Sequence, residues 1–164
     1  MRAEKICVHL LYYRLIKLEE LKMSFIKKKI KEELTKELVV NKIWGKHNTD
    51  INNNIDVYVD TLITQGFSED NVYKASVAHI HKEIASLQLK IKNELSQLEQ
   101  ELPKHCKQVV DSLREERELK DGLLLNCLIL FNEQCPDDVS EEREADLLRA
   151  FIIGRDTFTT PLGM

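Results

Sequence analysis

One uninterrupted run, VYKASVAHIHKEIASLQLKIKNELSQLEQEL (residues 72–102), constrains the fold more than any other part of the chain. It contains neither Gly nor Pro. Its apolar residues return at steps of three and four, which places them on one face of an α-helix. The steps are 4-3-4-3-4-4-3-4, a near-heptad pattern with one stutter. The predicted seam comprises Tyr73, Val77, Ile80, Ile84, Leu87, Ile91, Leu95, Leu98 and Leu102.

The length of this helix restricts what can surround it. A helix over residues 69–102 extends roughly 50 Å at about 1.5 Å per residue. That exceeds the diameter of a compact domain of 164 residues. The seam therefore needs cover from other helices of the chain or from a second copy. We expect an all-α fold, an elongated helical bundle of about five or six helices around one long central helix at about 69–102.

Helices are also predicted before this central helix. Apolar residues recur every four positions from Ser24, which predicts a helix that ends at Gly45. The following segment, KHNTDINNN (46–54), is rich in Asn and Asp and is predicted to be a loop. A short helix is expected at residues 55–65.

The junction between this short helix and the central helix has clear capping signals. Gly66 can adopt the left-handed conformation that ends a helix, and Phe67 can then pack back on the last turn. Ser68 is a favourable N-cap for the next helix, and acidic residues follow it. The sequence therefore predicts a tight corner between two helices.

The C-terminal half is predicted to be helical as well. Pro103 is expected to end or kink the central helix, a helix follows at 104–120, and Gly122 is expected to break the chain. The segment LLLNCLILF (123–131) is apolar on almost every side, which predicts a helix buried centrally or at an oligomer interface. Ser140 is expected to cap a last helix that ends at Gly154. Residues 155–164 are expected to form a C-terminal tail.

The first 22 residues allow two interpretations. They form an ordinary N-terminal helix, or they are an upstream extension of a gene whose true start is Met23. The second interpretation rests on Glu19 and Glu20, whose codons can form a purine-rich ribosome-binding sequence just before Met23. Residues 23–154 are predicted to form a single helical domain in either case.

Composition excludes several classes of protein. The net charge of −4 does not direct the chain toward nucleic acid or an anionic membrane. No window contains 18 uncharged apolar residues, so no membrane span is predicted. The four cysteines form no CxxC pair, and no signal peptide is recognised, so we expect a cytoplasmic protein with reduced thiols.

Candidate chemistry is sparse. His79 and His81 project in different directions from a helix and cannot share a metal ion. His105, Cys106, Cys127 and Cys135 could assemble a mixed zinc site, but they lack a signature spacing, and buried cysteines usually serve as small hydrophobes. No catalytic motif pairs a nucleophile with a base. We therefore expect no metal, no cofactor and no enzyme activity.

One stretch, VDTLITQGFSEDNVYKA (59–75), resembles a helix-turn-helix and, more faintly, a ubiquitin-associated domain. The helix-turn-helix resemblance implies a DNA-binding regulator that uses residues 55–82. Glu69 and Asp70 would then face DNA phosphates, which argues against that function. A capped corner explains the same residues without a ligand. The basic cluster KKKIK (27–31) could make a weak contact with a membrane surface or phosphate, but acidic residues follow it at once, so it is interpreted as a solvated helix face.

The function expected from these features is a small non-enzymatic helical protein–protein interaction module. It would act as an adaptor, a chaperone-like partner or an inhibitor, and it would be homodimeric. A nucleic-acid partner is not expected. The motivation is the long seam together with the apolar segment 123–131.

Overall fold

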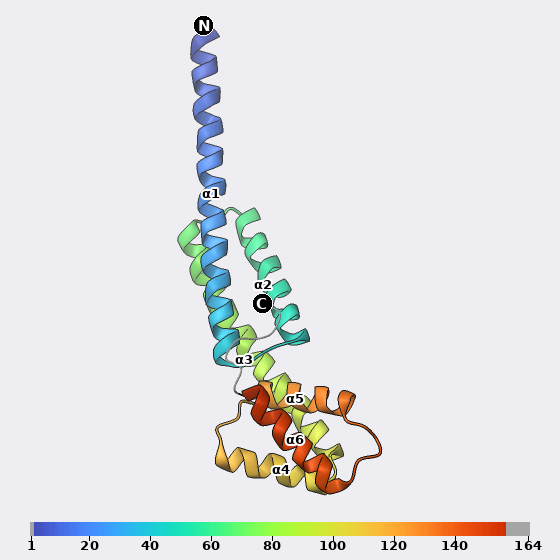
Figure 1. Cartoon of the computed structure of the whole chain (residues 1–164). Helices are drawn as coiled ribbons and strands as arrows, with labels where there is room; N and C mark the ends of the chain where they lie inside the picture. The colour runs from blue at the N-terminus through green and yellow to red at the C-terminus, as the bar shows by residue number, and fades with distance from the viewer. Residues whose placement is uncertain (1, 157–164) are drawn as a thin grey trace. The chain divides into compact units, whose positions relative to one another are not determined.

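The computed structural model describes residues 2–156, with side chains from residue 6 onward, and this part of the chain consists of six helices without a strand (Figure 1). The predicted all-α bundle of five or six helices is therefore confirmed. Of the predicted C-terminal tail, residues 155–156 instead belong to the last helix, and residues 157–164 lie outside the described residues. The helices are α1 (Arg2–Val40), α2 (Lys46–Thr64), α3 (Glu69–Glu101), α4 (Lys104–Glu116), α5 (Asp121–Gln134) and α6 (Glu141–Asp156).

The helices belong to two compact units. The first contains α1 up to Thr35 together with Asn52–His81, and the second contains Lys36–Ile51 together with the described residues from Lys82 onward. Both long helices, α1 and α3, contribute residues to each unit. A single domain over residues 23–154 stays a prediction.

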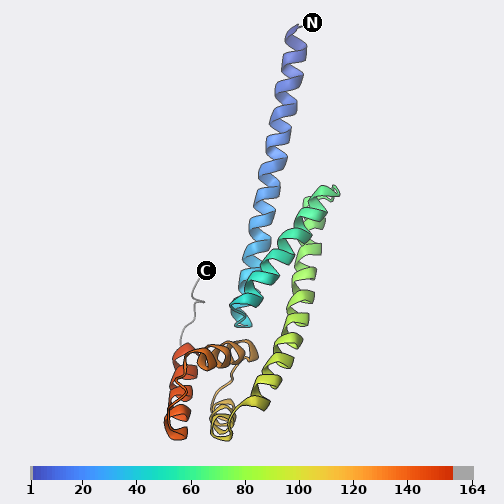
Figure 2. The same ribbon diagram turned by 90° about the vertical axis from the view of Figure 1, so that its right-hand side faces the viewer.

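The predicted corner between α2 and α3 is present in the first unit (Figure 2). Gly66 has a φ of +80°, in the left-handed region. Its amide donates to the Ile63 carbonyl at 3.0 Å, and the Phe67 amide donates to the Leu62 carbonyl at 3.3 Å. This pair of bonds is the Schellman motif. The Asn71 amide donates to the Ser68 hydroxyl at 3.4 Å, so Ser68 lies at the expected N-cap.

The predicted loop at residues 46–54 is wrong, because α2 already begins at Lys46. Ile51, Ile55 and Val59 lie four residues apart and are all buried. Their burial stabilises a helix through residues whose intrinsic preference is for turns. The Asn-rich segment is thus helical because one of its faces is packed.

The end of α1 also differs from the prediction. The helix ends at Val40, not at Gly45, and Lys42 adopts the left-handed conformation with a φ of +50°. The Ile43 amide donates to the Leu38 carbonyl at 2.9 Å, and the Ile43 side chain is buried. Burial of this apolar residue just after the helix compensates for the cost of a left-handed non-glycine residue.

The second unit contains the whole of α4, α5 and α6, and α6 packs against both α4 and α5. The apolar segment of α5 is helical, as predicted, and its side chains are mostly buried. Gly122 does not break the chain, because it lies inside the first turn of α5. A Cβ atom there would lie only 2.8 Å from the Lys42 carbonyl oxygen, so Gly122 permits close approach of two backbones.

Candidate functional site

The most distinctive surface is at the start of α1. We call residues 6–25 the apolar N-terminal segment. Its side chains are exposed from Ile6 to Lys22, and the first partly buried residue is Met23. Figures 1 and 2 show most of this segment extending past the α2–α3 corner, with no other described helix of its unit beside that extension. Its exposed large apolar side chains are Ile6, Val8, Leu10, Leu11, Tyr12, Tyr13, Leu15, Ile16, Leu18, Leu21 and Phe25.

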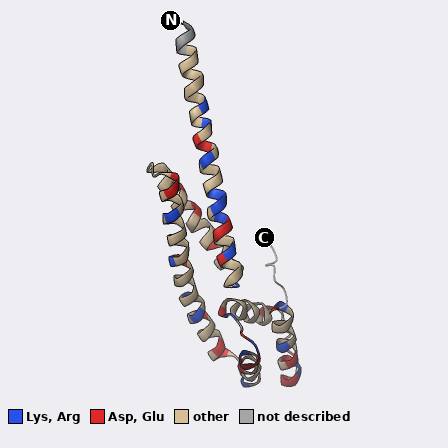
Figure 3. Cartoon of the chain, turned by 90° about the vertical axis from the view of Figure 1, so that its left-hand side faces the viewer, with Lys and Arg blue, Asp and Glu red and all other residues tan. Residues whose placement is uncertain are grey.

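These apolar side chains surround the helix instead of forming one stripe. Figure 3 shows a largely uncharged stretch toward the N-terminus, whereas Lys, Arg, Asp and Glu are frequent further along α1. A helix that is apolar on every side is normally buried within a larger assembly or a membrane. No helix of the described part of the chain is long and apolar enough to cross a membrane.

Within this segment, one row of residues has heptad spacing. Val8, Leu11, Leu15, Leu18, Lys22 and Phe25 lie at alternating steps of three and four. All six are exposed, and Lys22 is the only polar member. This is the pattern of a coiled-coil seam without its partner.

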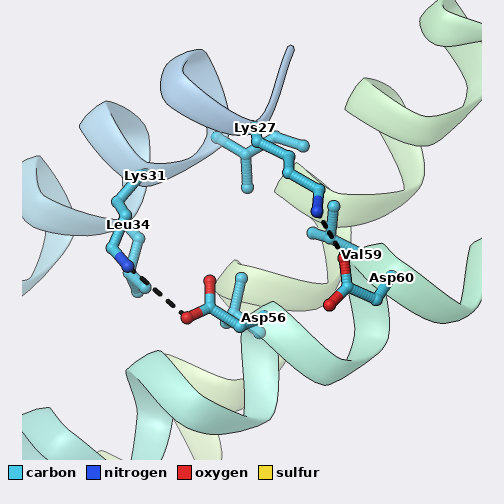
Figure 4. A pocket seen from close by; sticks show the side chains of 8 residues that line it. Lys27, Lys31, Leu34, Asp56, Val59 and Asp60 are labelled. Atoms are coloured by element: carbon cyan, nitrogen blue, oxygen red, sulfur yellow. Dashed lines mark hydrogen bonds and ion pairs between the residues drawn. The ribbon is translucent and has the colours of Figure 1, made fainter. Parts of the chain in front are cut away.

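The basic cluster at 27–31 is engaged with α2 (Figure 4). Lys27 contacts Asp60 at 2.6 Å, and Lys31 contacts Asp56 at 3.4 Å. These two ion pairs line a groove together with Ile30 and Leu34. Because both pairs are solvent-exposed, they contribute at most about 1 kcal/mol each. Two of the four lysines in this cluster are therefore paired with carboxylates of α2.

The charge distribution at the α2–α3 corner does not favour DNA binding. Glu69 and Asp70 are in the first turn of α3. Asp70 pairs with Lys74 at 2.7 Å, so the nearby cation is partly neutralised. His79 stacks on Tyr58 with 3.9 Å between the ring centroids, and this contact accounts for His79 without a metal ion.

The nine seam residues of α3 all have restricted exposure. Five are buried: Ile80, Ile84, Ile91, Leu95 and Leu102. The remaining four, Tyr73, Val77, Leu87 and Leu98, are partly buried. The chain therefore covers much of this seam itself, and the large unshielded apolar surface is on α1.

A second candidate site lies where α4 and α6 meet. The donor atoms of His105, Cys106 and Glu144 all lie within 4.8 Å of one another. His105 Nε2 is 2.7 Å from Glu144 Oε2. Burial, the charges of Glu144 and Cys135, and a hydrogen bond to Glu144 together raise the pKa of Cys106 to about 11. The thiol is therefore protonated at neutral pH.

The other cysteines predicted as candidate ligands differ in their surroundings. Cys135 follows α5, and burial with the charges of Glu144 and Asp137 raises its pKa. Cys127 is buried within α5, and its pKa is raised mainly by burial, with smaller effects from the charges of Arg155, Asp156 and Lys42. Cys127 thus does not join the cluster. The sequence reasoning missed Glu144, because only the packing of α6 against α4 brings it near His105.

Comparisons of the chain with protein-family models, with curated proteins and with solved structures find no match.

Proposed function

We propose that this protein is a non-enzymatic protein–protein interaction module that forms a homodimer through its apolar N-terminal segment. The observation that carries the proposal is the exposure of eleven large apolar side chains within residues 6–25. Five of them lie on the heptad row, and at roughly 100 Å² each they would contribute on the order of 500 Å² per copy, more than half of the ~800 Å² that each partner buries in a standard interface. Exposed apolar surface of this extent marks an interaction site.

The pattern of the segment favours a second copy as the partner. In a parallel, in-register pair, Val8, Leu11, Leu15, Leu18 and Phe25 would form the seam with their counterparts. Arg14 and Glu19 then occupy the flanking positions from which charges pair between parallel helices. Each copy supplies both the cation and the anion, so the pairing occurs twice.

Lys22 fits the same arrangement as a polar residue within the seam. A single polar residue at such a position specifies register and favours a defined oligomer at some cost in stability. Lys22 also lies 3.7 Å from Glu69 of α3 in the first unit, which offsets its charge. Its presence supports a specific dimer instead of unspecific association.

A cytoplasmic location forms part of the proposal. All four cysteines are free thiols, which suits a reducing compartment. The alternative of a DNA-binding regulator that uses residues 55–82 has less support, because the first turn of α3 is acidic.

Size-exclusion chromatography with light scattering tests the dimer. The wild type should be dimeric at tens of micromolar, and Leu18→Asp should be monomeric. The substitution removes about 100 Å² of apolar contact from each copy, about 5 kcal/mol per dimer at ~25 cal/mol/Å², so Kd should rise at least 1,000-fold. A monomeric wild type would refute the proposal.

A matched control separates dimer loss from misfolding. Leu89 is 62% exposed and lies on α3, outside the segment, so Leu89→Asp should leave the dimer intact. Helix orientation is tested with Leu18→Cys, which should form a disulfide with its own counterpart only if the helices are parallel and in register. Absence of that cross-link in a confirmed dimer would exclude the parallel arrangement.

A further inference from the structure

Three unlike donor groups converge in the second unit. His105 and Cys106 lie in the first turn of α4, and Glu144 lies in the first turn of α6. Their nitrogen, sulfur and oxygen donors are within 4.8 Å of one another. The Cys106 side chain is fully buried, whereas those of His105 and Glu144 are 20% and 25% exposed. An ion could therefore reach the cluster from the His105 and Glu144 side.

The donor types match one metal best. Zinc binds thiolate, imidazole and carboxylate together, whereas magnesium and calcium take oxygen ligands. Ligands at the usual zinc distances of about 2.0–2.3 Å lie about 3.6 Å apart in a tetrahedron. His105 and Glu144 are closer than that at 2.7 Å, and all donor atoms lie within 4.8 Å of one another, so small movements of the partly exposed His105 and Glu144 side chains would give this spacing.

We propose that His105, Cys106 and Glu144 bind one zinc ion, which would link the start of α4 to the start of α6. The Cys106 thiol loses its proton to solvent when the sulfur binds the ion. The His105 Nε2 atom exchanges its contact with Glu144 for a bond to zinc. This site differs from the sequence expectation of no metal, and it does not depend on the proposed dimer.

Cobalt substitution tests the site directly. Purified wild-type protein, freed of metal by a chelator and titrated with Co²⁺, should bind one equivalent. Its spectrum should show a thiolate-to-cobalt charge-transfer band and the intense visible bands of tetrahedral coordination. Zn²⁺ should then displace the cobalt and abolish these bands. Failure of the full-length chain to bind either ion at micromolar concentration would overturn the proposal.

Two variants and one control assign the ligands. Cys106→Ser should abolish the charge-transfer band, and Glu144→Gln should weaken zinc binding at least 10-fold. Glu144 is partly exposed, so Glu144→Gln should stay folded even if Cys106→Ser does not. Cys127→Ser, which removes a buried thiol outside the cluster, should bind as the wild type does. A band that survives in Cys106→Ser and disappears in Cys127→Ser would contradict the assignment.

The zinc ion should also stabilise the second unit, because it binds only to the assembled cluster. The midpoint of thermal unfolding should rise with zinc concentration in the wild type and in Cys127→Ser. It should not rise in Glu144→Gln. Equal increases in all three proteins would show unspecific binding and refute the site.

Discussion

Replacement of Gly122 by alanine should destabilise the protein, although helix propensity alone predicts the opposite. Gly122 lies in a helix, where alanine is favoured over glycine by up to about 1 kcal/mol. The added Cβ would lie 2.8 Å from the Lys42 carbonyl oxygen and 3.3 Å from that of Asn41. Both obstacles are backbone atoms, so rotation of a side chain cannot relieve the contact.

The magnitude follows from the displacement that the contact requires. Either the start of α5 or the turn after α1 must move by several tenths of an ångström, and both are anchored by buried residues, Leu123 and Ile43. Overpacking of this kind costs about 1–3 kcal/mol. After subtraction of the propensity gain, Gly122→Ala should lower the free energy of unfolding by up to about 2 kcal/mol.

Gly154 of α6 is the matched control, because a Cβ atom there meets nothing within 4 Å. Gly154→Ala should raise the free energy of unfolding by up to about 1 kcal/mol. Urea unfolding followed by circular dichroism measures both variants, and melting temperatures should move in opposite directions by about 2–4 °C per kcal/mol. A Gly122→Ala protein as stable as Gly154→Ala would refute the close backbone approach.

Three further predictions concern the buried α5 helix and the start of the chain. Burial raises the pKa of Cys127 from 9.0 to about 11, so its thiol ionises more readily in the unfolded chain. The free energy of unfolding should therefore fall between pH 9 and 11 by up to about 2–3 kcal/mol. Urea titrations of Cys127→Ala should show a smaller fall over the same pH range. Leu128→Ala should lower the free energy of unfolding by about 3–5 kcal/mol, because the Leu128 side chain is 0% exposed. The neighbouring Ile129 is 38% exposed, so Ile129→Ala should lower it by well under half as much in the same assay. The proposed dimer requires residues 6–22, so intact-mass analysis of the native protein should show a species that retains them, and an N-terminus at Met23 would refute the proposed dimer segment.

Local signals in the sequence determined the long α3 helix and the corner before it. The run from Glu69 to Glu101 lacks Gly and Pro, and its seam has a regular helical period. Gly66 and Ser68 act through hydrogen bonds to residues within five positions along the chain. Such interactions can be predicted from the local sequence, because both partners are close together in the chain.

Long-range packing decided the features that the sequence did not reveal. The Asn-rich start of α2 is helical because Ile51 is buried, and Gly122 is required by the Lys42 backbone, eighty positions away. His105 meets Glu144 only because α4 packs against α6. Propensity and spacing describe a residue and its near neighbours, whereas these contacts depend on which distant elements share a core.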